Sequence, residues 1–533
     1  MDSEYAVQEL NSTISGFRSS IDTQMNQIDA TTNRIQETTN EIYQSVSEFK
    51  ENMIKSEEVQ LAHENLIRID QVLKEQFGDY ARIRKTIIGV VRDFDINLVR
   101  NKTIQELSEE LWLTSSRYWL SYALIAVTAW VNDYPEVAAN AVAEGTRRDR
   151  IKATLFFTLL NLRFGRNETA RRWFTEYLKT LDPKCMQNEA AVMLQAYLSG
   201  VFGTDKALQA KVNATIEKWI GIINEDAEIC RELVGDYAKY IANMQAPAQF
   251  DFVSIRQFCK NAQQIEGVYR DVSKFATLQA IVDSLDVSEI EQRPDNYKAR
   301  VDAVLTDLIT NYDQDEDELR TQQQYFNLVI KNNGVVEDAQ KQYDEMLRLK
   351  GEGFNVGRQM ISWVIYDDQQ NTDVHVRKFA LSQTKTWLID AMNAYSDNIK
   401  QRTPTGYQLA IDGWEGVSNG NDQTAMETSL KEYFDTHKLT MVYLTIPNVV
   451  AAVLAVLCAG LAFVSLYFLI GLGLGLIFLG VSIWRNLKAF PERVKAALQN
   501  LANTMQEIGA FQHSCAEGHS ICAATIEKLN FNF

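Results

Sequence analysis

The sequence predicts an all-α fold with long coiled-coil-like terminal helices, a helical middle domain and a C-terminal transmembrane helical hairpin. Three observations support this prediction. Only seven prolines occur in 533 residues, so the chain has few helix breakers. Apolar residues recur every seven positions near both ends, as they do in helices that pack side by side. Near the C-terminus, the 46 residues from Leu439 to Trp484 include no Asp, Glu, Lys, Arg or His.

Composition is that of an ordered protein in a reducing compartment. Apolar residues make up 46% of the chain, which is enough for a sizeable core. The formal net charge of −17 argues against nucleic acid as the main partner. Six cysteines are scattered along the chain and form no disulfide framework. No apolar run follows the acidic first residues, so no cleaved signal peptide is expected.

Changes in composition divide the chain into six segments. They are long amphipathic, coiled-coil-like helices (1–100), a helical core domain with one TPR-like helix pair (101–245), a further helical region (246–400), a loop-rich linker (401–438), the transmembrane hairpin (439–487) and a heptad-containing helical tail (488–533). A chain of this length is expected to form about two to four folding units.

An isoleucine stripe runs along the N-terminal helix, with the members Ile14, Ile21, Ile28, Ile35, Ile42 and Phe49. The other seam position reads Leu10, Phe17, Gln24, Thr31, Thr38 and Ser45. That half of the seam is polar beyond its first two turns, so strong self-pairing is not expected. We expect this helix to lie on other helices through a narrow stripe, or to pair conditionally.

The middle of the chain is typical of a buried helical core. The apolar run Leu120–Trp130 is too short to cross a membrane and is flanked by Arg117 and Asp133, which predicts a buried helix. Residues 151–183 resemble one tetratricopeptide-type helix pair. The residues that carry this resemblance are Leu160, Gly165, Ala170, Phe174 and Pro183. A generic helical hairpin is favoured over it, because no neighbouring unit repeats at the same period.

The same region contains a basic window in an otherwise acidic chain. Between residues 147 and 184, ten Lys and Arg oppose four Asp and Glu, an excess of six positive charges. Such a window suits an anionic surface, an acidic partner or a nucleotide, and internal pairing with acidic residues is the favoured alternative. The candidate anionic-surface or partner patch consists of Arg147, Arg148, Arg163, Arg166, Arg171 and Arg172.

Two stretches before the apolar run contain loop or metal-site signals. Asp313, Asp315 and Asp317 resemble the start of a calcium loop, but Glu318 stands where the loop needs glycine. We therefore predict an acidic helix start there. From residue 402 to residue 424, frequent glycine together with a proline predicts a loop.

The uncharged run is long enough for two membrane crossings. One helix of 46 residues would be about 70 Å long, whereas a hydrocarbon core is about 30 Å thick and needs roughly 20 residues. We predict spans at about 444–464 and 468–487, with a turn near Ser465–Tyr467. A buried hairpin of a soluble protein is the less favoured alternative. The residues assigned to the membrane are Leu444, Val464, Gly471, Gly475 and Trp484.

Two features of the predicted hairpin carry topological information. Arg485, Lys488, Arg493 and Lys495 follow it, which places both of its ends on the cytoplasmic side by the positive-inside rule. Gly471 and Gly475 form a GxxxG face that allows another helix to approach closely. Packing of the two spans on each other is the favoured use of this face, and self-association between chains is the alternative.

The tail contains a more complete heptad seam than the N-terminal helix, from Val494 to Leu529. Cys515, His519 and Cys522 share its face and are a weak zinc candidate, with packing as the favoured explanation. Because neither terminal seam is complete enough to be left in water, we predict that the two pack together. In that bundle Ile21, Ile28 and Ile35 would cover Leu498, Leu501 and Ile508 or their neighbours.

Three functional hypotheses remain open. No phosphate-binding, nucleophile-elbow or zinc-protease motif occurs, so the favoured function is a membrane-anchored helical scaffold without catalysis or cofactor. Its expected partners are the lipid bilayer and a protein, or another copy of itself. A pore-forming or membrane-perturbing effector is the alternative, because the hairpin tip is uncharged. This layout is similar in outline to helical cytolysins of the ClyA type, which place the hairpin elsewhere and lack the large middle region. An enzyme with an unrecognised site is the second alternative.

Overall fold

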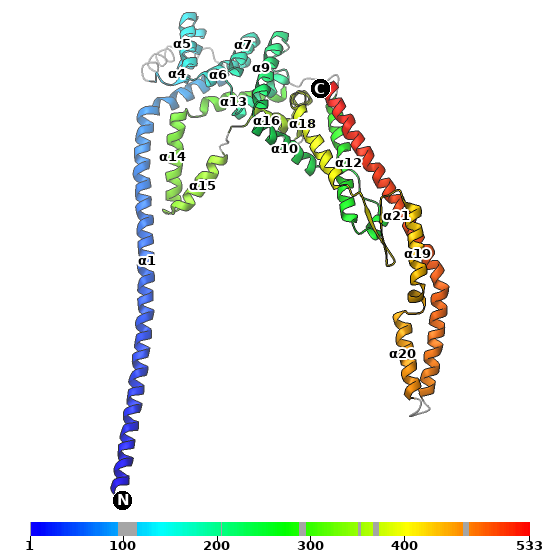
Figure 1. The fold of residues 1–533 in the computed structure, drawn as a ribbon. Coiled ribbons are helices and arrows are strands. Elements are labelled where there is room, and N and C mark those ends of the chain that lie inside the picture. Colours follow the sequence, from blue (N-terminus) through cyan, green and yellow to red (C-terminus); the bar gives the residue numbers. More distant parts are fainter. Residues whose placement is uncertain are drawn as a thin grey trace. The chain divides into compact units, whose positions relative to one another are not determined.

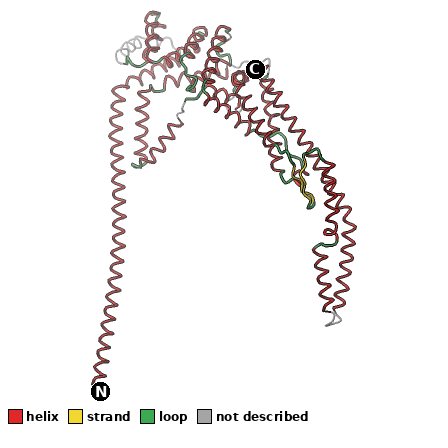
Figure 2. The backbone as a smooth tube through the Cα atoms, in the orientation of Figure 1, coloured by secondary structure: helices red, strands yellow, loops and turns green. Residues whose placement is uncertain are grey.

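The computed structural model describes residues 2–93, 115–203, 205–286, 295–349, 353–365, 372–461 and 468–533. Over these residues the chain is helical apart from one two-stranded sheet, so the predicted all-α class is confirmed (Figures 1 and 2). The chain forms two compact units, each built from two separate stretches of sequence. The N-terminal unit comprises residues 1–180 and 301–353, and the C-terminal unit comprises residues 181–300 and 354–533.

The N-terminal unit consists of helices. They are α1 (Asp2–Asp93), α4 (Trp119–Val131), α5 (Pro135–Arg148), α6 (Arg150–Arg163), α7 (Asn167–Leu178), α14 (Gln314–Lys331), α15 (Val336–Leu349) and most of α13 (Asp295–Thr310). Helix α1 alone has 92 residues. Figure 1 shows α14 beside the C-terminal half of α1, while the N-terminal half of α1 extends away from α14 and α15.

A buried ionic cluster fixes α14 on α1. The Arg84 guanidinium donates to Glu316 at 2.8 and 3.0 Å, and Arg320 donates to the same carboxylate at 3.0 Å. Glu316 is fully buried, so its negative charge requires these two partners. Both guanidinium groups also lie over the ring of Tyr312. As the sequence predicted, Asp313 directly precedes a helix whose first turn is acidic.

Helices α4 to α7 follow one another along the chain, and each packs against the next. Helix α4 is apolar on nearly every face and is buried, which confirms the prediction for Leu120–Trp130. The Asp149 side chain caps α6 by accepting the Lys152 backbone N–H at 2.9 Å. Gly165, with φ of +68°, provides the left-handed residue that ends α6 before α7 begins. The predicted helix pair over residues 151–183 therefore exists as α6 and α7.

The C-terminal unit contains the remaining helices and both strands. They are α8 (Asn188–Leu198), α9 (Lys206–Asn224), α10 (Ala227–Asn243), α11 (Val253–Phe258), α12 (Ala262–Leu285), α16 (Val356–Ile365), α18 (Val374–Arg402), β1 (Tyr407–Ile411), β2 (Trp414–Ser418), α19 (Gln423–Val442), α20 (Ile446–Leu461) and α21 (Phe468–Asn532). Helix α21 joins the second half of the apolar run to the tail in one continuous helix of 65 residues.

The tail part of α21 buries its seam inside its own unit. Its buried residues are Ala497, Leu501, Met505, Ile508, Phe511, Cys515, Cys522 and Leu529. They face α11, α12, α18 and α19, and Figure 1 shows α12 running alongside α21. These neighbours cover the face within the C-terminal unit, while within the N-terminal unit Ile21, Ile28 and Ile35 are about 60% exposed. The tail therefore finds helical partners within its own unit, and its predicted bundle with the N-terminal stripe stays a prediction.

Residues 401–438, predicted as a loop-rich linker, contain a β-hairpin and most of helix α19 instead. Strands β1 and β2 lie side by side (Figure 2). They pair antiparallel, with Ile411 opposite Trp414. Asp412 and Gly413 form the two-residue turn, with φ of +50° and +89°. An Asp-Gly pair suits this turn because both positions need positive φ. Buried and exposed residues alternate on both sides of Asp412-Gly413, and this pattern indicates a β-hairpin that the loop prediction did not include.

Candidate membrane-spanning hairpin

The helix breaks between α19 and α20, at the start of the apolar run. Pro447 lies in the first turn of α20, where its missing N–H costs little. The Asn448 side-chain amide donates to the carbonyls of Val442 and Tyr443 at 3.2 and 3.3 Å. The Asn486 amide of α21 donates to the same Val442 carbonyl at 3.3 Å. Two amides thus satisfy carbonyls that the end of α19 leaves without a helical partner.

Small residues line the contact between α20 and the first part of α21. A Cβ atom at Gly471 would lie 3.1 Å from the Cys458 sulfur. One at Gly475 would lie 3.3 Å from the Cβ of Ala455 and 3.8 Å from the Ala451 carbonyl oxygen. The GxxxG face therefore packs within the chain, which was the favoured use of Gly471 and Gly475. The predicted turn Ser465–Tyr467 and Val464 lie outside the described residues.

Large apolar side chains cover the outer faces of both helices. On α20 and just before it they are Leu444, Ile446, Val449, Val450, Val453, Leu454, Val456 and Leu457. On α21 they are Ile470, Leu474, Leu476, Ile477, Phe478, Val481, Trp484 and Leu487. All are at least 43% exposed, and Ile446 reaches 81%. A continuous apolar surface of this extent is typical of a site that contacts lipid or another protein.

Aromatic and basic side chains gather where both helices leave the apolar region. Tyr443 and Trp484 lie at this end, and the Lys488 ammonium lies 5.5 Å from the Trp484 ring. The Lys438 ammonium lies 5.7 Å from the ring of Phe490. Aromatic and cationic side chains are typically enriched at membrane–water interfaces.

Fold and site together define the class: an all-α protein with two helical stretches, Gln423–Ala459 and Ile470–Asn532, that are long and apolar enough to cross a membrane. Both helical stretches qualify by their length and composition, and the exposure of their apolar side chains agrees with this. No protein-family profile, no curated protein and no solved structure matches the chain.

Just outside the apolar run, the β-hairpin joins α19 to α21. Arg493 of α21 forms an ion pair with Asp412 in the β-turn. The Trp414 indole N–H donates to the Ser429 hydroxyl of α19 at 3.2 Å. A Cβ at Gly413 would lie 2.7 Å from the Tyr433 hydroxyl, so the turn lies directly on α19. Helices α19 and α21 are thus held together before they enter the apolar region.

The basic window is extensively paired inside the N-terminal unit. Arg147 and Arg148 share Glu144, with the shortest N–O distances at 2.6 and 2.9 Å. Arg163 pairs with Asp302 at 2.8 Å and Arg172 with Glu168 at 2.6 Å. These contacts favour the alternative of internal pairing over a free anionic-surface patch that would also include Arg166 and Arg171.

The structure gives no support to the zinc candidate in the tail. Cys515 and Cys522 are buried, and burial raises the pKa of each thiol to about 11, which disfavours the thiolate a metal needs. His519 Nδ1 lies 2.9 Å from the Ser396 hydroxyl. Among the described residues, no group of three or more His, Cys, Asp or Glu is arranged to hold a metal ion.

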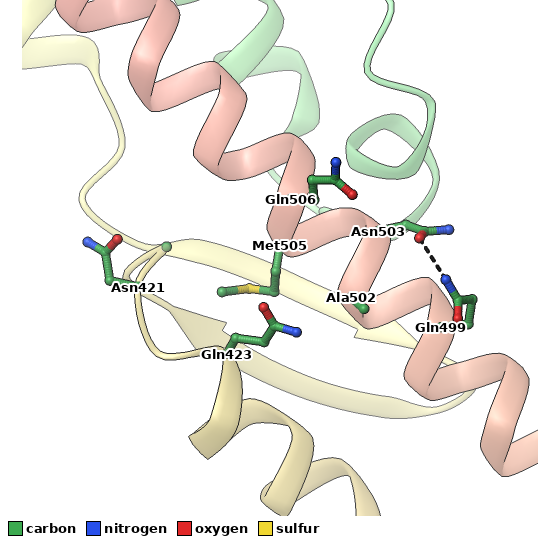
Figure 3. Close-up of a pocket in the computed structure, with 8 residues that line it drawn as sticks. Asn421, Gln423, Gln499, Ala502, Asn503, Met505 and Gln506 are labelled. Carbon is green, nitrogen blue, oxygen red and sulfur yellow. Dashed lines mark hydrogen bonds between the residues drawn. The ribbon is translucent and has the colours of Figure 1, made fainter.

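A surface pocket lies between the β2–α19 loop and α21 (Figure 3). Its volume is about 500 Å³, and its lining is Gly420, Asn421, Gln423, Gln499, Ala502, Asn503, Met505 and Gln506. The Gln499 amide donates to Asn503 at 3.0 Å, so part of this polar lining is already satisfied (Figure 3). None of the lining side chains titrates near neutral pH, so the pocket offers no general acid or base.

Proposed function

We propose that the protein is a membrane-anchored helical scaffold without catalytic activity, in which α20 and the first part of α21 form the transmembrane hairpin. The observation that carries this proposal is the outward exposure of large apolar side chains on both helices, while small residues form their mutual contact. In water this arrangement would leave the most apolar surface of the chain hydrated. In a bilayer the same surface lies in hydrocarbon, and the two helices satisfy their own backbone groups.

The dimensions support a complete crossing. The 20 residues of α21 from Phe468 to Leu487 span about 30 Å at 1.5 Å per residue, the thickness of a hydrocarbon core, and the 16 described residues of α20 span about 24 Å of it. The interfacial level is set by Tyr443, Trp484 and Lys488 at one end. Both flanking helices, α19 and the tail of α21, leave the hairpin at that end. The basic flank that includes Arg485 and Lys495 supports a cytoplasmic side for both.

Permanent anchoring is favoured over triggered pore formation. A protein that stores an apolar hairpin for later insertion must cover it in the soluble state, because exposed apolar surface causes aggregation. In the described part of the C-terminal unit, the outer faces of α20 and of α21 as far as Leu487 remain exposed.

Reconstitution into dye-loaded liposomes tests the proposal. We expect the protein to remain in the lipid fraction after alkaline carbonate washing, without releasing dye. A matched control replaces residues 444–484 by a short Gly-Ser linker. The Asn486–Val442 hydrogen bond of 3.3 Å shows that the two cut ends lie close together, so a short linker can join them. We expect this variant to be soluble with both units folded.

Two results would contradict the proposal. Removal of the wild-type protein by carbonate would show that the hairpin does not span the bilayer. Dye release at a rate proportional to bound protein would instead make the molecule a pore former.

Protease protection in sealed vesicles gives the topology, because cleavage sites in α1 and in the tail must be protected or accessible together.

A further inference from the structure

Helix α1 presents an uncovered apolar seam along its N-terminal half. Every side chain described between Ser15 and Ile54 is exposed. Contact with the rest of the N-terminal unit begins at Lys55, where the α14–α15 turn at Gly334 lies against the Lys55 backbone. A Cβ on Gly334 would lie 2.0 Å from the Lys55 carbonyl oxygen. Residues 15–54 of α1 therefore form a helical arm of about 60 Å whose described side chains are exposed.

A second seam position makes the apolar face of this arm nearly continuous. The exposed apolar residues alternate in steps of four and three, because the second seam position lies four residues after each isoleucine. The ten positions are Ile21, Met25, Ile28, Thr32, Ile35, Thr39, Ile42, Val46, Phe49 and Met53. Eight of them are large apolar residues, so a seam through these positions is more complete than one through the positions three residues after each isoleucine.

The two threonines in the seam present less polarity than their residue type indicates. The Thr32 hydroxyl donates to the Ile28 carbonyl at 2.8 Å, and that of Thr39 donates to the Ile35 carbonyl at 2.7 Å. Because each hydroxyl donor is satisfied by its own helix, each threonine can pack its methyl group against an apolar neighbour. Threonine and asparagine also lower the intrinsic helix propensity of residues 31–40, so a packed partner would stabilise the helix here.

We propose that this arm pairs with the arm of a second copy of the chain in an antiparallel two-helix coiled coil. When the ten positions of one copy are aligned with those of the other in reverse order, each layer joins two complementary side chains. Ile21 faces Met53, Met25 faces Phe49, Ile28 faces Val46, Thr32 faces Ile42 and Ile35 faces Thr39. Each threonine meets an isoleucine, and the largest side chain meets a flexible methionine. A parallel pair would instead stack threonine on threonine twice and phenylalanine on phenylalanine.

Charges beside the seam favour the same partner and direction. Asp29 and Lys50 each follow a seam residue and lie on the same edge of the helix. In an antiparallel pair this edge faces the same edge of the other copy, so Lys50 lies toward Asp29 of its partner at both ends. The other edge carries Gln24, Thr31, Thr38 and Ser45, which have no charge to repel a copy. A parallel pair would join the charged edge to the uncharged one and gain no ion pair. This inference does not depend on the role of the hairpin.

Directed disulfide cross-linking of the full-length protein in detergent tests the pairing. The background carries Cys185→Ser, because Cys185 is exposed. Thr38 lies at the centre of the antiparallel pair, so we expect Thr38→Cys to form a covalent dimer. Ile21→Cys and Met53→Cys should each fail to link alone and should link when two differently tagged variants are mixed. Glu37→Cys, on the opposite face, is the matched control and should remain monomeric.

Concentration-dependent mass measurements supply an independent test. Ile28→Ala with Ile35→Ala removes four apolar contacts per dimer and should raise the dissociation constant by roughly 100-fold or more. Glu37→Ala with Glu41→Ala, which alters the outer face, should change it less than threefold. Because the altered side chains are exposed in the monomer, all variants should retain the wild-type melting temperature at concentrations where the protein is monomeric.

Several results would overturn the proposal. A monomeric wild-type protein at concentrations near 100 µM would show that the arm does not pair with a copy of itself. Self-linking of Ile21→Cys would show a parallel pair. Equal self-association of the Ile28→Ala/Ile35→Ala and Glu37→Ala/Glu41→Ala proteins would place any dimer contact elsewhere, for example on the hairpin.

Discussion

In the tail of α21, Leu501, Ile508 and Phe511 are fully buried, whereas Ile28 and Phe49 of α1 are 60% and 71% exposed. Both segments carry apolar residues at alternating steps of three and four, and both belong to very long helices. The difference comes from their neighbours. Helices α12, α18 and α19 cover the tail, and α14 covers α1 only from about Lys55 onward. A heptad pattern thus specifies that a face needs a partner, and the fold specifies whether the chain itself supplies it.

The largest expected contrast comes from removing one phenylalanine in each seam. Phe511→Ala should destabilise the C-terminal unit by about 3–5 kcal/mol, because it leaves a cavity among packed helices. Phe49→Ala should change the stability of the monomer by less than about 0.5 kcal/mol, because the ring is exposed. Thermal unfolding in detergent measures both. A large loss with Phe49→Ala at concentrations where the protein is monomeric would mean that α1 is covered by its own chain.

Glycine positions give the second contrast. A Cβ at Gly518 would lie 2.0 Å from a methyl carbon of Val272 and 3.1 Å from its carbonyl oxygen, so α12 and α21 approach closely there. Gly518→Ala should therefore cost about 1–3 kcal/mol through overpacking. Gly16→Ala in α1 meets nothing within 4 Å and should raise helicity, as alanine favours a helix over glycine by about 1 kcal/mol. Circular dichroism and melting curves of the two variants check this pair, and a stabilised Gly518→Ala protein would contradict the close contact.

Removing an ion pair should change the stability of either helix, α1 or α21, much less than removing a buried apolar side chain does. Arg493 of α21 is 47% exposed in its pair with Asp412, so Arg493→Ala should cost less than about 1 kcal/mol. Lys55 of α1 pairs with Glu51 at 2.6 Å across one helical turn, and Lys55→Ala should cost about 0.3–0.5 kcal/mol. A cost for Arg493→Ala comparable to that for Phe511→Ala would show that the ion pair, rather than burial, fixes α21.

The smallest expected effect is a pH dependence confined to the tail. Burial first, and the nearby positive charge of Lys400 second, hold the pKa of His519 below its usual value of about 6.5. Because the folded state binds this proton less readily than the unfolded state, the contribution of His519 is fully present above about pH 6.5. It decreases as the pH falls below that value toward the lower folded pKa.

The melting temperature of His519→Gln, compared with wild type between pH 7.5 and pH 5, isolates this contribution. We expect the variant to lose less stability than wild type on acidification. Residues 15–54 of α1 contain no histidine, so the arm should contribute nothing to the difference. An identical pH dependence of the two proteins would show that His519 titrates equally in both states.

Much of the candidate site could be inferred from the sequence, and some of it could not. The absence of charge from Leu439 to Trp484 indicated two apolar helices, and the GxxxG spacing indicated a face for close approach. Asn448 and Asn486 gave no comparable signal, because their common acceptor at Val442 depends on how α20 returns along α21. The Asp412–Arg493 pair joins residues 81 positions apart, and only the β-hairpin brings them together.

What the sequence determined by itself was local: helical class, the uncharged run, the periodic seams and the acidic start of α14. Each follows from near-neighbour chemistry, such as helix propensity, spacing along one face and the transfer of side chains out of water. Tertiary structure alone decided the use of those features. The fold pairs residues of the basic window with Glu144, Asp302 and other acidic residues. It buries the tail of α21 against α12, and it leaves the arm of α1 exposed within its own unit. Partner choice depends on which distant segments the fold brings within contact, and a local pattern carries no information about that.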